Sequence, residues 1–406
     1  MKTRTSISIK DVFYILLIVS MTFPIVVQIP ILGRPWIFAS LGVIIGLYSL
    51  YKKHFVKCQA FIWLVIYEII VVVNFLWGDA YFNSPFKVLF EFIYLFLPVT
   101  LFRYFSDKIS SFIILLICFF LFFIECTIVS AIAETVFPGI IRLLSNEESI
   151  NEYQSIVTSF QNLGMSNYLL PHAVPVLIPA IVYNIKKSVW KYRIWFIIAL
   201  ISALVLVYVS NATTAILLSI IMLFSSVLIR SRKGGNSMLL LLIVLLPILL
   251  SPTLQLKIVN GISYVTEEND LLGSKLQEIE ESIEYGDGQG GVAKRNDLYE
   301  QSINAFLGSA LVGTNEKSYG GHSAILDRLA TLGIFGVIPF YIYLMLVFRD
   351  TKKMMPDSAK QYYYLGIIAV IVLLFMKNMS YWPTWCATFF LLPNMLLLNK
   401  HNKIEK

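Results

Sequence analysis

The sequence predicts an all-α polytopic membrane protein. Of its 406 residues, 57% are hydrophobic and only 14% are charged, whereas an average soluble domain has about 25% charged residues. Long apolar segments follow one another almost from end to end, and short clusters of Lys and Arg separate them. We therefore expect a single membrane domain over residues 1–406 rather than two or three soluble domains.

Twelve segments are predicted to span the membrane as helices, because about 20 apolar residues in a helix cross about 30 Å of hydrocarbon. The first follows a basic N-terminus and has no obvious small-residue cleavage site, so we expect a retained helix. The segments are 12–29, 36–51, 59–77, 86–105, 109–133, 167–185, 194–210, 213–230, 237–254, 322–348, 362–380 and 384–399.

The basic residues predict the orientation of these spans, because cytoplasmic loops collect Lys and Arg. If the N-terminus is cytoplasmic, seven short cytoplasmic pieces carry 22 of the 32 basic residues. Both chain ends are then expected in the cytoplasm. The formal charge of +7 is explained by these orientation signals, and a nucleic-acid partner is not expected.

Two extracytoplasmic loops are too long to be turns: 134–166, and the larger 255–321 between the ninth and tenth spans. Apolar residues recur at helical spacing in both loops, which predicts amphipathic helices. Such helices either lie on a surface or pack on the spans, and both interpretations stay open. The apolar positions are Ile150, Tyr153, Ile156, Val157, Phe160 and Leu163 in the first loop, and Leu272, Leu276, Ile279 and Ile283 in the second.

Ionisable side chains at membrane depth are costly, so each is a functional candidate for which a partner is sought. Lys87 and Glu91 are four residues apart in the fourth span, which favours an ion pair within that helix. Glu68, Glu125 and Lys377 have no partner within their own helices. They either line a cavity or pair between helices.

The segment 294–341 holds the residues that best suit chemistry. His322 follows two glycines at the mouth of the tenth span, where histidine is either an interfacial anchor or, with an ordinary pKa near 6.5, a proton acceptor. Asp327 lies five residues later, about 140° around a helix from His322, so a direct His–Asp dyad is not expected. Asp327 and Arg328 are expected to fix neighbouring helices or to touch a substrate from another side.

Four arginines are predicted outside the cytoplasmic face. Arginine suits bidentate binding of phosphate oxygens and stays charged at any working pH. If these arginines converge above one cavity, they would make a pyrophosphate site. The alternative is contact with lipid headgroups, above all for Arg34. The four arginines are Arg34, Arg142, Arg295 and Arg328.

One pattern in this region resembles the signature of the Wzy-type O-antigen and capsular polysaccharide polymerases, which share a broad superfamily with the O-antigen ligases. The match covers about fifty residues, and the layout of many spans with one large late extracytoplasmic loop supports it. The pattern consists of Arg295-x-x-Leu298-Tyr299, Ala305-Phe306, GSALVGTN at 308–315, His322-Ser323, Leu326-Asp327, Gly333 and Gly336.

The chain departs from the family pattern at two points. Many members have proline and leucine before the glycine turn, where this chain has Ala310 and Leu311. Ligases commonly have asparagine after the histidine, where this chain has Ser323. Ser323, followed by the pair Leu326-Asp327, favours a polymerase over a ligase.

The resemblance implies a GT-C-like fold and a glycosyltransferase of the bacterial cytoplasmic membrane. It would pass a growing glycan from undecaprenyl pyrophosphate to an incoming lipid-linked repeat unit, without nucleotide sugar, metal or other cofactor. Arg295 and other outer arginines would hold the leaving pyrophosphate, and His322 would take the proton from the attacking hydroxyl. Tyr299 and Asp327 are expected among the substrate-binding residues, and a chain-length regulator and a flippase among the partners.

Three alternatives stay open. An O-antigen-type ligase would use the same chemistry. A lipid-linked oligosaccharide flippase or secondary carrier also suits twelve spans with buried charges, although such carriers commonly have two repeated halves and this chain has one asymmetric large loop. A scaffold in a polysaccharide-export complex would explain the hydrophobicity equally well.

Overall fold

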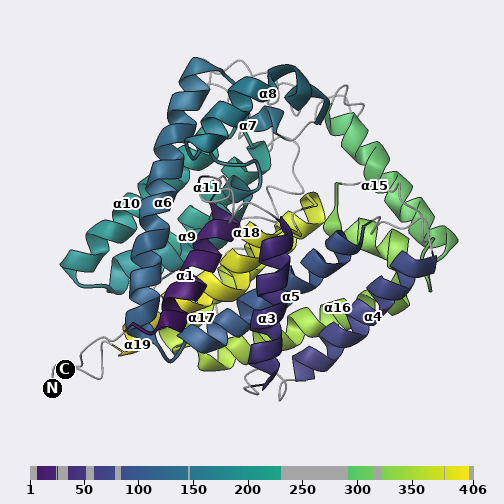
Figure 1. Ribbon diagram of the computed structural model, residues 1–406, viewed down its shortest axis with the longest axis horizontal. Coiled ribbons are helices and arrows are strands. Elements are labelled where there is room, and N and C mark those ends of the chain that lie inside the picture. Colours follow the sequence, from purple (N-terminus) through teal and green to yellow (C-terminus); the bar gives the residue numbers. More distant parts are fainter. Residues whose placement is uncertain are drawn as a thin grey trace.

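Every regular element in the described part of this computed structural model is a helix (Figure 1). The structure describes residues 7–23, 25, 35–51, 59–77, 84–144, 147–229, 291–314, 322–378 and 380–401. The helices that overlap predicted spans include α1 (Ile9–Thr22), α3 (Pro35–Tyr51), α4 (Gln59–Trp77), α5 (Pro85–Phe105), α6 (Ile109–Val136), α9 (Leu170–Lys187), α10 (Trp190–Val209), α11 (Thr213–Leu228), α16 (Ala324–Met354) and α17 (Asp357–Met376).

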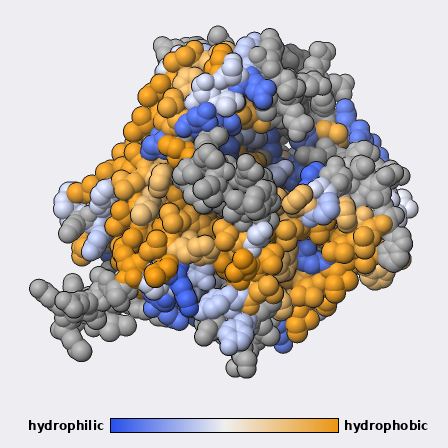
Figure 2. Space-filling view, in the orientation of Figure 1, coloured by the Kyte–Doolittle hydropathy of each residue, from blue (hydrophilic) through white to orange (hydrophobic). Residues whose placement is uncertain are grey.

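Six of these helices, α4, α5, α6, α10, α16 and α17, are long and apolar enough to cross a membrane. By length and composition they confirm the prediction of an all-helical, multi-pass membrane protein. The other predicted spans overlap α1, α3, α9, α11 and a final run of three helices. The segment 237–254 and most of the end of the first span, 24–29, lie outside the described residues. On the face shown in Figure 2, apolar residues cover the flanks over α6 and α4.

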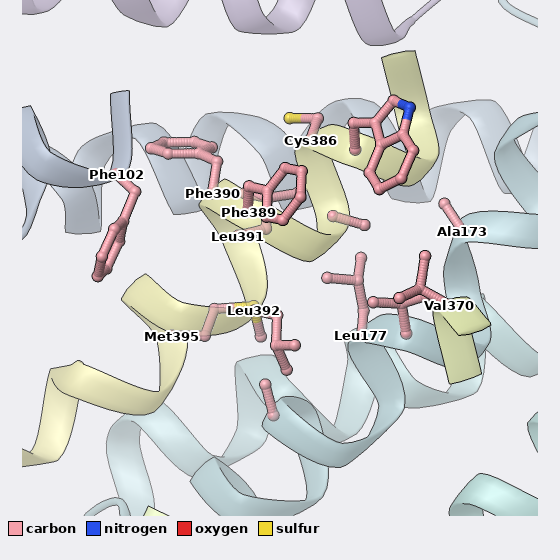
Figure 3. Close-up of a cluster of buried hydrophobic side chains, with 14 of the residues drawn as sticks. Phe102, Ala173, Leu177, Val370, Cys386, Phe389, Phe390, Leu391, Leu392 and Met395 are labelled. Carbon is pink, nitrogen blue, oxygen red and sulfur yellow. The ribbon is translucent and has the colours of Figure 1, made fainter. Parts of the chain in front are cut away.

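The final run consists of α18 (Trp382–Cys386), the π-helical turn η1 (Ala387–Leu391) and α19 (Leu392–His401). Its apolar side chains form the middle of the core, where they meet side chains of α5, α9 and α17 (Figure 3). Phe390 contacts Phe105 and Phe112 edge-on, with ring centroids 5.6 and 5.9 Å apart. This run therefore connects the early helices α5 and α6 to the late part of the chain.

The first long loop contains the predicted amphipathic helix. It folds as α7 (Ile140–Leu143) and α8 (Glu147–Asn162). Val157 is buried in a small cluster at the end of α6, and Tyr153 and Phe160 pack on that cluster, whereas Ile156 and Leu163 are exposed. One side of the apolar stripe thus packs on a span, which is one of the two interpretations given above. The stripe predicted at 272–283 lies outside the described residues.

A buried carboxylate ties α1 to α5 and α6 just before the apolar part of α1. Asp11 is 2% exposed, and its oxygens accept hydrogen bonds from Tyr104 (2.6 Å), Lys108 (3.1 Å) and Ser111 (3.0 Å). Ser8 and Asp11 also cap α1 reciprocally. Burial acts to raise the pKa of Asp11, but the hydrogen bonds from Tyr104, Ser8 and Lys108 outweigh it and hold the pKa well below its ordinary value of 3.8.

This shift predicts acid sensitivity. Because the folded pKa of Asp11 is lowered, its contribution to stability is present above about pH 4 and is lost as pH falls through the folded pKa. The free energy of unfolding, measured from pH 6 down to pH 3, should fall more steeply for the native chain than for Asp11→Asn. Identical pH profiles for the two proteins would contradict this assignment.

Candidate functional site

Two parts of the family-like pattern, the glycine turn and Gly333, meet where α16 is broken. Gly333 interrupts this helix with φ 62° and ψ −174°, a backbone conformation that is essentially restricted to glycine. The break divides α16 into a short segment, 324–332, and a long segment, 334–354. Broken backbone at membrane depth needs replacement hydrogen bonds, because hydrocarbon supplies none.

The turn at 309–314 supplies these hydrogen bonds. The amides of Ile334 and Phe335 donate to the carbonyl oxygens of Ala310 (2.9 Å) and Leu311 (3.1 Å). In return, the amide of Thr314 donates to the carbonyl oxygen of Ala330 at 2.9 Å. We call this pairing of the turn 309–314 with residues 330–335 the clasp.

Gly313 allows the two backbones of the clasp to come together. Its φ is 76°, and a Cβ atom at this position would collide with the backbone of Thr331. A Cβ atom at Gly333 would likewise collide with the backbone of Leu311 and Gly313. Of the glycines in the sequence pattern, Gly313 and Gly333 are therefore required by geometry. Gly336 lies where α16 packs on Ile70 of α4.

Alanine substitutions should distinguish the two glycines of the clasp from a nearby glycine outside it. Gly313→Ala and Gly333→Ala should each destabilise the protein by roughly 1–3 kcal/mol, because they combine backbone strain with a collision. Gly308→Ala is the matched control, since nothing lies within 4 Å of its Cβ position. Thermal unfolding of the purified protein tests this, and equal melting temperatures for all three variants would contradict the clasp.

A buried ion pair lies next to the clasp. Nη2 of Arg328 is 2.5 Å from Oε1 of Glu91, and the two side chains are 3% and 9% exposed. Arg328 also donates to Tyr67 (3.2 Å) and Ser380 (2.6 Å), and its Nη1 donates to the carbonyl oxygen of Ala324. These contacts join α16 to α4, α5 and the loop before α18.

Aromatic rings enclose this ion pair. The guanidinium of Arg328 lies 4.7 Å from the centroid of the Phe340 ring, which favours a cation–π contact. In a straight helix these two residues would be separated by about 18 Å along the axis, so the break at Gly333 brings them together. Trp385 packs edge-on against Phe340 and donates to Ser380 at 3.2 Å.

The partner of Glu91 differs from the one expected within its own helix. Glu91 pairs with Arg328 of α16, whereas Lys87 is exposed. The expectation that Arg328 fixes neighbouring helices is confirmed by its contacts with α4 and α5. Glu68, next to Tyr67, has a buried Oε1 atom without a hydrogen-bond partner among the described residues.

Breaking the ion pair should be costly. Glu91→Gln leaves the Arg328 charge buried without its counter-ion, which we expect to cost about 3–5 kcal/mol. The matched control is Asp357→Asn, which removes the exposed pair with Lys360 and should cost less than about 1 kcal/mol.

The measurement is unfolding in SDS, in which the double variant Glu91→Leu with Arg328→Met should regain most of the stability that Glu91→Gln loses. Equal losses in Glu91→Gln and Asp357→Asn would overturn the assignment of a buried pair.

Helix α15 (Gly291–Gly308) carries the first part of the pattern to the same place. Tyr299 donates to the carbonyl oxygen of Met376 at the end of α17, at 2.9 Å. One turn later, Ser302 donates to Asp327 at 3.0 Å. Arg295 lies on α15 four residues before Tyr299, and its side chain is outside the described part.

His322 stands directly before α16 and is half-buried. The next residue, Ser323, is the N-cap of α16 and accepts a hydrogen bond from the amide of Leu326 at 3.2 Å. The amide of Ala324 donates to the carbonyl oxygen of Lys377 at 3.4 Å. The start of α16, which carries His322, is thus held against the end of α17.

No protein-family model and no curated protein matches this chain. Serine and asparagine are about equally good N-caps, so the capping role of Ser323 carries no argument between a polymerase and a ligase.

The structure brings together four of the seven predicted site residues: Tyr299, His322, Asp327 and Arg328 lie on α15 and at the start of α16. Arg295 shares α15 with Tyr299. Arg142 lies in α7 and its side chain is not described, and Arg34 is outside the described residues. Within the described ranges, no group of three or more His, Cys, Asp or Glu side chains could hold a metal ion.

Sequence reasoning missed the residues that hold Arg328. Tyr67 and Ser380 are separated from it by 261 and 52 positions, and neither belongs to the sequence pattern. Their polarity within apolar surroundings was the only available signal. The backbone pairing of the clasp has no side-chain signal beyond its two glycines.

Proposed function

We propose that this chain is a membrane-embedded polysaccharide polymerase. It transfers a growing glycan from undecaprenyl pyrophosphate to an incoming lipid-linked repeat unit, on the outer face of the bacterial cytoplasmic membrane. The observation that carries this proposal is the meeting of the family-like pattern in one place: α15, the glycine turn and the start of α16 are joined by Ser302–Asp327 and by the clasp. A GT-C-like arrangement of twelve spans belongs to the same proposal.

The arrangement of the ends of the chain supports the proposed orientation. The start of α1 and the end of α19 lie at one end of the described structure, and α15 lies away from them (Figure 1). Two basic residues lie toward this end: Lys108 binds the carboxylate of Asp11, and Lys186 binds the carbonyl oxygen of Ser226 near the end of α11. Together with the positive-inside rule, this supports the proposal that α15 and His322 face the outer side.

In the proposed reaction, the hydroxyl of the acceptor sugar attacks the anomeric carbon of the donor glycan. The bond from that carbon to the pyrophosphate oxygen breaks, and the pyrophosphate leaves with the electron pair. His322 takes the hydroxyl proton, and Arg295 binds the leaving pyrophosphate. Arg142 and Arg34 are proposed as further anion ligands.

Arg328, Asp327 and Tyr299 have a different part in this proposal. The donors of Arg328 are directed to Glu91, Tyr67, Ser380 and its own helix, so we assign it to positioning the start of α16. Asp327 and Tyr299 fix α15 through Ser302 and Met376. Any contact of these three residues with the glycan or its pyrophosphate stays a prediction.

A flippase or carrier is the second candidate, because broken helices at membrane depth form the binding sites of many transporters. The clasp argues against a transporter. The amides that lose their helical partners at the break donate to the protein's own turn, so they are not available to a substrate. An O-antigen-type ligase remains the alternative within the same chemistry. A chain-length regulator and a separate flippase are proposed partners.

Reconstitution tests the proposal. In liposomes with undecaprenyl-pyrophosphate-linked repeat units, the native protein should give a ladder of longer glycans without nucleotide or added metal. Arg295→Ala and His322→Ala should each slow chain growth by about 100-fold or more, with normal insertion and melting temperature. Arg349→Ala, at the exposed far end of α16, is the control and should keep full activity.

One outcome would reject this function, and another would reject only the assignment of its site. Net movement of lipid between leaflets without any lengthening would identify a flippase. Full activity in both the Arg295 and His322 variants would show that the site has been assigned to the wrong residues.

A further inference from the structure

We propose that the end of α15 and the turn 309–312 form a re-entrant element whose outer surface contacts the hydrocarbon of the bilayer. This differs from the sequence expectation, in which 255–321 was an extracytoplasmic loop. The inference concerns the medium around the turn and does not depend on the proposed reaction.

The depth of the turn follows from α16. Arg349, Asp350 and Lys353 form exposed ion pairs at the far end of this helix, and charged groups of this kind mark the edge of the hydrocarbon. Phe335 lies 14 residues before Arg349, about 21 Å along the helix. Because the hydrocarbon is about 30 Å thick, Phe335 lies about 9 Å inside the opposite edge, and a tilt of α16 would place it deeper.

The clasp carries this depth over to the turn. Leu311 accepts the amide hydrogen bond of Phe335 at 3.1 Å, and Ala310 accepts that of Ile334. The turn therefore lies at the same level as Phe335. At the other end of α15, Tyr299 is bonded to Met376 at the end of α17, so α15 descends from the membrane edge toward the clasp.

The exposed side chains change polarity along this descent. Asp297 and Glu300 are exposed near the start of α15. Further along, Ile303 is 43% and Leu307 is 68% exposed, and in the turn Leu311 is 59% and Val312 is 68% exposed. Such a surface would be unfavourable in water.

We identify lipid acyl chains as the cover of this surface because the surface is continuous with that of a span. Phe335 and Ile338 are 61% and 44% exposed on α16, a helix apolar enough to cross the membrane. The exposed side chains of the turn extend that same apolar face. Acyl chains that cover Phe335 would therefore also cover Leu311 and Val312, while the hydrogen-bonding groups of the broken backbone are satisfied within the protein.

This placement has a consequence for the candidate site. The backbone of Arg295 lies on α15, four residues or about 6 Å before Tyr299. Tyr299 in turn is bonded to the end of α17. Anchoring the turn in hydrocarbon would therefore hold Arg295 at the level of the lipid phosphates.

Spin labelling measures the medium directly. The four native cysteines, Cys58, Cys118, Cys126 and Cys386, are replaced in the full chain, and single cysteines are introduced as Leu311→Cys and Val312→Cys. After labelling in liposomes, collision rates with oxygen, which is enriched in hydrocarbon, are compared with those of a water-soluble nickel chelate. Ile338→Cys is the hydrocarbon reference, and Glu300→Cys is the aqueous reference.

The ratio of oxygen to nickel collisions at 311 and 312 should equal that at 338 and exceed that at 300, with Ile303→Cys between the two. A ratio at 311 and 312 equal to that at 300 would place the turn in water and overturn the proposal. Low collision rates with both reagents at 311 and 312 would show a protein partner, such as a second copy of the chain, and would overturn it as well. Glycan synthesis enters neither result, so failure here leaves the proposed reaction to its own test.

Discussion

The rest of the candidate site depends on one constraint: the backbone groups freed by the break at Gly333 must be hydrogen-bonded, because hydrocarbon offers them no partner. The turn 309–314 meets this requirement through backbone pairing with residues 330–335. Because the turn is continuous with α15, the same pairing fixes that helix against α16. The break thus determines where Tyr299 and Ser302 lie relative to Asp327.

The buried charge of Arg328 is the second consequence of the break. Bending α16 brings its guanidinium over Phe340 and within reach of Glu91. A buried pair of this kind is weak evidence for stability, since apolar residues often replace it without loss. Its strong directional bonds to α4 and α5 favour a positioning role, in which the start of α16, and with it His322, has a single orientation.

Most of the spans could be predicted from the sequence, because the requirement of membrane depth acts on every residue of a span. The predicted limits of the third span, 59–77, are those of α4. The tenth span was predicted as continuous, since one glycine in an apolar run has no hydropathy signal. Its break became evident only from the position of the turn that fills it.

The site was harder to predict than the spans. The residue pattern placed Tyr299 and Asp327 in one region, and they lie on α15 and at the start of α16, which Ser302 joins. The ion pair of Glu91 was expected at local helical spacing, but its partner lies 237 positions away. Local rules contain no information about such a partner, and the same is true of Tyr67 and Ser380.

Hydrogen–deuterium exchange of the native protein in lipid nanodiscs tests the central claim most directly. If the clasp forms, the amides of peptides covering 309–314 and 330–336 should exchange as slowly as those of the buried helix α9. Rapid exchange of 309–314, at the rate of unstructured chain while α9 and α17 stay protected, would show that the turn is free in water. That result would contradict the clasp and the arrangement of the site built on it.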